Sequence, residues 1–104
     1  MDDSYANGLT ALAGGGQAGA ILIAATKNRF TTVATTGDSA LLPVAAPGLH
    51  YYVKNAGANS MNIFPNTGDV INALSANTAF ALASGKMALF VSMAKGSWDA
   101  LLGA

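Results

Sequence analysis

The sequence predicts an all-β fold, either a small antiparallel β-sandwich or a jelly-roll-like barrel, with an extended N-terminal arm. Short apolar or alternating runs recur along the chain, as expected for strands with at least one buried face. Turn residues separate these runs about every 8–12 residues, which is the spacing of small all-β domains. No long stretch has the uninterrupted repeat of an amphipathic helix.

The first 18 residues are rich in Ala, Gly and small polar residues. Three consecutive glycines at 14–16 lower the propensity for helix and strand alike and raise the entropy lost on ordering. We therefore expect residues 1–18 to form an arm that is either flexible or docked on a partner. Residues 19–104 are expected to form a single β-domain.

The first half of the domain contains three extended segments. An apolar run at 20–25 predicts a strand covered on both faces, and residues 27–29 are expected to be a turn. Threonine-rich residues 30–36 predict the next strand. Because Pro43 and Pro47 lack backbone donors, residues 39–48 are expected to be an edge strand or an extended crossover.

Residues 50–69 are predicted to be a β-hairpin. Tyr51 and Val53 alternate on one arm and Met61 and Ile63 on the other, with a small polar loop around Gly57 between them. The tripeptide Thr-Gly-Asp at 67–69 also occurs at 36–38, and each copy precedes a short apolar run. The two copies are either a weak internal duplication or a recurrence of common turn residues.

After a short strand at 70–74, the last third of the chain is expected to contain three more strands. The first lies within 75–85, between a loop and a turn, with Phe80 and Leu82 on one face, and the others are at 87–96 and 96–104. Helix is the competing prediction for residues 79–94, because Ala, Leu and Met favour helices. Gly85 interrupts that helix, and Met87, Leu89, Val91 and Met93 alternate with Ala88, Phe90 and Ser92 at a period of two. Strands are therefore preferred.

The composition predicts a protein that associates with other subunits. Charged residues make up 10% of the chain and the formal net charge is zero, whereas soluble domains typically have roughly 25% charged residues. A thin, alanine-rich core and a sparsely charged surface both favour oligomerisation. No basic stripe suggests nucleic-acid binding, and no segment has the pattern of a signal peptide or a membrane span.

No residue pattern predicts catalysis, a cofactor or a metal site. His50 is the only histidine and there is no cysteine. Asp38 and Asp69 lie in the Thr-Gly-Asp turns, where they are expected to cap backbone amides rather than bind Ca²⁺, and Asp99 is expected on an exposed strand. The glycines near 14–16 lack the phosphate-loop pattern. The prediction is therefore no enzyme and no site residues.

Four aromatic residues are the remaining candidates for a site. They could form either a sugar-stacking platform or part of the core: Tyr51, Tyr52, Phe64 and Trp98. In a chain this short the core is the expected use.

Several short motifs resemble small virion structural proteins of tailed bacteriophages. The motifs are Val-x-Asn-x-Gly at 53–57, Ile-Phe-Pro at 63–65, Gly-Asp-Val-Ile at 68–71 and Gly-Ser-Trp at 96–98, with Leu-Leu-Pro at 41–43 and Ala-Pro-Gly at 46–48 upstream. The resemblance covers roughly residues 30–100, and its motifs are mostly structural.

The resemblance implies a capsid decoration (cement) protein that binds and stabilises the assembled head. It implies a homotrimer, with the major capsid protein as partner, on the capsid exterior of a virion assembled in the host cytoplasm. The alternatives are a tail, neck or baseplate component and a carbohydrate-binding module of a fibre. No catalytic residue is carried over.

Overall fold

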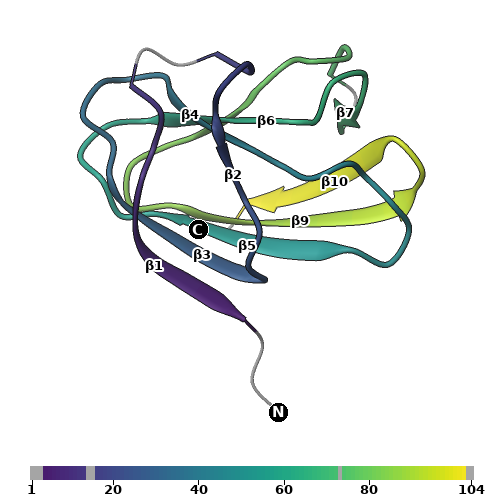
Figure 1. The fold of residues 1–104 in the computed structure, drawn as a ribbon, viewed down its shortest axis with the longest axis horizontal. Coiled ribbons are helices and arrows are strands. Elements are labelled where there is room, and N and C mark those ends of the chain that lie inside the picture. Colours follow the sequence, from purple (N-terminus) through teal and green to yellow (C-terminus); the bar gives the residue numbers. More distant parts are fainter. Residues whose placement is uncertain (1–3, 14–15, 73, 103–104) are drawn as a thin grey trace.

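A computed structural model describes residues 4–13, 16–72 and 74–102, and these form ten strands and no helix (Figure 1). The strands are β1 (Tyr5–Thr10), β2 (Ile21–Leu22), β3 (Lys27–Thr32), β4 (Asp38–Leu41), β5 (His50–Asn55), β6 (Met61–Phe64), β7 (Val70–Ile71), β8 (Phe80–Leu82), β9 (Met87–Ala94) and β10 (Ser97–Leu102). The predicted all-β class is confirmed. No helix in these described ranges is long and apolar enough to cross a membrane.

The strands form two sheets that face each other (Figure 1). One sheet has six strands in the order β1-β3-β5-β9-β10-β7, and the other has four in the order β2-β4-β6-β8. From β1 to β6 the chain alternates between the two sheets, and each of β1 to β4 pairs in parallel with the strand two places further along. This part of the chain therefore winds like a short β-solenoid.

Antiparallel pairing, which was predicted throughout, is limited to part of the described structure. It joins β5 to β9, β9 to β10 and β6 to β8, while the pairs of the solenoid-like part and the β10–β7 pair are parallel. The prediction of a β-hairpin at 50–69 is wrong, because β5 belongs to the six-stranded sheet and β6 to the four-stranded sheet. The loop between them crosses from one sheet to the other.

Asn55 holds this crossing in place. Its side chain is fully buried, and its Nδ2 donates to the carbonyl oxygens of Asn59 at 2.8 Å and Leu82 at 2.9 Å. Its Oδ1 accepts from the Gly57 amide at 3.0 Å. Gly57 packs so tightly that a Cβ would lie 2.7 Å from the backbone nitrogen of Val33. Because Asn55 bonds to main-chain groups on both sides of the loop, the chain turns away from β5 rather than folding back beside it.

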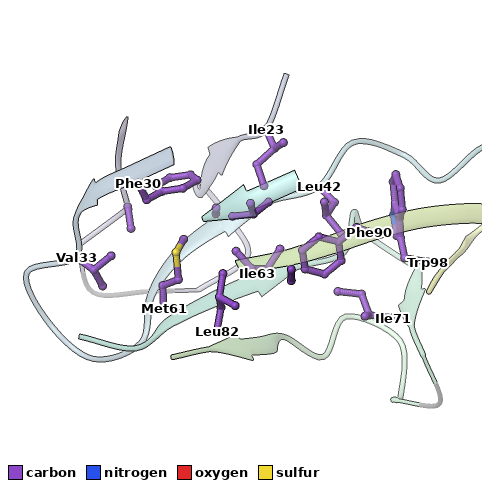
Figure 2. Packing of buried hydrophobic residues seen from close by; sticks show 14 of the residues in the cluster. Ile23, Phe30, Val33, Leu42, Met61, Ile63, Ile71, Leu82, Phe90 and Trp98 are labelled. Carbon is purple, nitrogen blue, oxygen red and sulfur yellow. The ribbon is translucent and has the colours of Figure 1, made fainter. Parts of the chain in front are cut away.

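The core lies between the two sheets and is built mainly from their inward-facing apolar side chains (Figure 2). Phe80 of the four-stranded sheet contacts Phe90 of the six-stranded sheet edge to face, with ring centroids 5.5 Å apart. Trp98 is fully buried and packs against Tyr51 with centroids 5.8 Å apart. As predicted, Tyr51 and Val53 share the inner face of β5.

Three strand predictions need correction. The run at 20–25, predicted to be a strand covered on both faces, contains only the two-residue strand β2, and both of its side chains are exposed. Residues 27–29, predicted as a turn, begin β3, because the buried Asn28 bonds through Nδ2 to the carbonyls of Ala25 and Tyr52. Residues 39–48 were predicted to be an edge strand or an extended crossover. Residues 39–41 belong to β4, which lies between β2 and β6 rather than at a sheet edge. Residues 42–48, which include Pro43 and Pro47, follow the strand and cross to β5 in the other sheet, as the second alternative predicted.

Part of the segment predicted as an arm is a strand. β1 pairs in parallel with β3 of the same chain and forms one edge of the six-stranded sheet. Leu12 then makes an antiparallel bridge with Ser39. Residues 1–3 and 14–15 of the predicted arm lie outside the described residues.

Candidate binding surface

The outer face of the six-stranded sheet, the face turned away from the four-stranded sheet, is the candidate binding surface. In β9, strand alternation points Ala88, Phe90 and Ser92 into the core. The alternate residues Met87, Leu89, Val91 and Met93 therefore lie on the outer face. The described residues of the outer face, as defined here, are Tyr5, Lys27, Arg29, His50, Tyr52, Lys54, Met87, Leu89, Val91, Met93, Asp99 and Leu101.

Strand register aligns five of these side chains in one row across five strands. Tyr5 is opposite Lys27, Lys27 is opposite Tyr52, and Tyr52 is opposite Leu89. Leu89 is in turn opposite Leu101. Side chains at paired positions are direct neighbours on a sheet, so the row is a continuous surface. Lys27 lies between the two tyrosines, and Leu89 and Leu101 form the aliphatic end of the row.

Several apolar side chains on this face are largely in water. Tyr5 is 77% exposed, Met93 71% and Leu101 69%, and Met87 is exposed as well. Single exposed apolar residues are ordinary on soluble proteins, whereas a contiguous group marks an interaction surface.

The β1–β3–β5 end of the outer face forms a groove with a volume of about 540 Å³. The residues that line it come from four strands: Tyr5, Ala6, Asn7, Lys27, Asn28, Arg29, Tyr52, Lys54 and Met87. Among the residues that the structure describes, this lining includes three of the five basic residues of the chain and no acidic residue. The groove is therefore a basic site with aromatic and thioether walls.

The residues considered for catalysis do not come together. His50 is exposed on β5, where its ring meets the edge of Tyr52 at a centroid distance of 6.3 Å. Asp99 is exposed on β10, opposite Val91. Within residues 4–13, 16–72 and 74–102 no group of three or more His, Asp or Glu side chains is arranged to hold a metal ion.

Asp38 and Asp69 are buried and bond to the backbone. Asp38 Oδ2 accepts from the amide of Thr35 at 3.1 Å, which confirms the predicted capping of its own turn. Asp69 Oδ2 accepts instead from the amide of Ala45 at 2.8 Å and so links two separate loops. The two turns lead into different sheets, since β4 follows the first and β7 the second.

The structure uses the predicted aromatic residues in different ways. Trp98 and Tyr51 pack in the core, as expected, and therefore offer no sugar-stacking platform. Tyr52 lies on the outer face, in the groove. Of the glycine-rich stretch, Gly16 accepts a hydrogen bond from Ser39 Oγ and Gln17 Nε2 donates to the carbonyl of Pro65, so these described residues tie loops together.

Comparisons with known proteins gave no match. Models of protein families, curated proteins and solved structures were each searched, and none matched this chain. The outer face is thus the feature from which a function can be argued.

Sequence reasoning missed this surface although part of its signal was present. The alternation of Met87, Leu89, Val91 and Met93 with Ala88, Phe90 and Ser92 was recognised, but the larger apolar set was not expected to face solvent. The basic groove has no local sequence signal, because Lys27 and Lys54 are far apart in the chain and meet only through strand pairing.

Proposed function

We propose that this protein is a virion structural protein of a tailed bacteriophage, a decoration protein that binds the exterior of the assembled head and stabilises it. In this proposal it binds as a homotrimer, its partner is the major capsid protein, and the particle is assembled in the host cytoplasm. The observation that carries the proposal is the outer face, a sheet surface that holds exposed apolar side chains in register across neighbouring strands.

Burial of this face against a protein surface supplies the binding free energy. Apolar area contributes roughly 25 cal/mol per Å² removed from water, and Tyr5, Met93 and Leu101 are each mostly exposed in the isolated chain. Met87 and Leu89 extend the same surface. Exposed apolar side chains spread over several strands of one sheet face suit a broad protein partner better than a small substrate.

A homotrimer strengthens such contacts through avidity. Three copies of one modest surface, held together, bind a repeating lattice far more tightly than a single copy does. A ligand that binds only the assembled shell also stabilises that state by mass action. Both effects need the outer face of each protomer to reach the shell.

The motifs behind the phage resemblance consist of residues that stabilise this fold. Val53 and Trp98 are core residues, Asn55 and Gly57 hold the crossing between the sheets, and Asp69 links two loops. Residues with such roles are expected to recur wherever this fold recurs. We further propose that the two facing sheets correspond to the small β-sandwich of such virion proteins, wound here in a solenoid-like order.

Leu101 and Leu102 provide a matched test. Both are exposed neighbours on β10, but alternation places only Leu101 on the outer face. Purified protein is mixed with expanded heads that lack it, and bound protein and the melting temperature of the heads are measured. We expect Leu101→Asp to weaken binding and to abolish the gain in head stability, while Leu102→Asp leaves both near wild type.

Light scattering of the isolated protein tests the homotrimer, and fluorescence of Trp98 confirms that each variant is folded. Wild-type protein that does not bind heads would refute the proposal. So would a folded Leu101→Asp variant that binds as tightly as Leu102→Asp.

A further inference from the structure

We propose that the basic groove at the β1–β3–β5 end of the outer face holds an extended acidic segment of the protein partner. The proposal rests on the proposed function only for the identity of that partner, the head shell. It adds the chemistry of the docking segment: carboxylates flanked by apolar side chains.

The first argument is the like charge of Arg29 and Lys54, which are directly opposite each other on neighbouring strands of the groove. Like charges at opposed positions of a sheet destabilise it. An anionic occupant would turn this repulsion into attraction.

The acidic residues that the structure describes do not supply that anion. Asp38 and Asp69 are buried in loop contacts, and Asp99 lies on β10, three strands away from β3. Neighbouring strands are about 4.8 Å apart, so Asp99 is separated from Arg29 by roughly 14 Å of sheet.

The donors needed to bind a carboxylate are present. No described contact engages the guanidinium of Arg29, which offers paired N–H groups for a carboxylate. Lys54 Nζ donates once, to the carbonyl of Gly85 at 2.8 Å, and an ammonium has three donors. The two side chains together accommodate one or two carboxylates.

The walls of the groove favour a peptide over a nucleic acid. Tyr5, Tyr52 and Met87 line it beside the cations, and the row then continues into Leu89 and Leu101. A nucleic-acid strand requires cations to continue along its path, whereas here the cations give way to aliphatic side chains. A peptide that alternates acidic and apolar residues matches both parts.

Head binding gives the first test. We expect Arg29→Glu to weaken binding to expanded heads roughly tenfold or more, as expected for a lost charge-assisted contact. Lys95→Glu is the matched control, because Lys95 is an exposed cation in the β9–β10 turn, away from the groove. If Arg29→Glu and Lys95→Glu bind equally well, the proposal is overturned.

A peptide gives the second test, independent of heads. The probe is a synthetic peptide of alternating aspartate and leucine, and its counterpart has asparagine at each aspartate. We expect the acidic peptide to shift the amide NMR signals of Arg29 and Lys54 in isotope-labelled protein, and the asparagine peptide to leave them unchanged. Equal shifts with both peptides, or no shift with either, would overturn the proposal.

Other occupants are distinguished in the same way. Tighter binding of oligothymidylate than of the acidic peptide, at equal salt, would assign the groove to nucleic acid. Loss of self-association in an Asp2→Asn, Asp3→Asn variant would assign it to a second copy. Either result overturns the proposal, while peptide binding by a protein that ignores heads would overturn the proposed function alone.

Discussion

Replacement of Asn55 by alanine is expected to remove much of the stability of this fold. The buried side chain makes three hydrogen bonds to main-chain groups, at 2.8 Å to Asn59, 2.9 Å to Leu82 and 3.0 Å to Gly57. Each buried group left without a partner costs about 1–3 kcal/mol. Because water entering the new space would satisfy some of these groups, we expect a total loss of about 3–5 kcal/mol.

That loss is large beside the stability of a domain of this size, about 5–15 kcal/mol. It corresponds to a fall in melting temperature of at least about 12 °C, since 1 kcal/mol shifts a small domain by roughly 4–8 °C. The assay is urea unfolding at a fixed protein concentration, followed by fluorescence. Trp98 is the only tryptophan and is fully buried, so its emission reports loss of the core.

Asn59→Ala is the control for this prediction. The Asn59 side chain makes one hydrogen bond, from Nδ2 to the carbonyl of Val33 at 2.8 Å, and the residue is only half-buried. We expect a loss of about 1 kcal/mol. If Asn55→Ala is destabilised no more than Asn59→Ala, then Asn55 does not hold the crossing between the sheets.

Two further substitutions test the loops by the same urea unfolding assay. Gly57→Ala should lower the free energy of unfolding by about 3 kcal/mol, because the added Cβ would lie 2.7 Å from the backbone nitrogen of Val33. Its control, Gly85→Ala, should lower it by about 1 kcal/mol, because Gly85 has a positive φ of +81° but open space around it; equal losses for the two variants would contradict the tight contact at Gly57. Asp69→Ala should lower the free energy of unfolding by about 1–3 kcal/mol, because it leaves the buried amide of Ala45 without a hydrogen-bond acceptor. An unchanged urea midpoint would show that this hydrogen bond does not contribute to stability.

The strands of the second half of the chain could be predicted from local pattern. Period-two alternation and turn residues located the strands at 50–55, 61–64, 80–82, 87–94 and 97–102 to within a few residues. These signals are local, since a strand exposes and buries successive side chains whatever it pairs with. The same reasoning placed Trp98 and Tyr51 in the core and Asp38 in a capped turn.

The sequence by itself determined that this chain forms strands, because alternation and turn chemistry act over a few residues. Tertiary structure decided how those strands pair, since pairing joins residues far apart in the chain. It made β5 and β6 members of different sheets, and it turned Leu89 outward because Ala88 and Phe90 fill the space between the sheets. It also brought Arg29 beside Lys54, so the basic groove exists only in the folded protein.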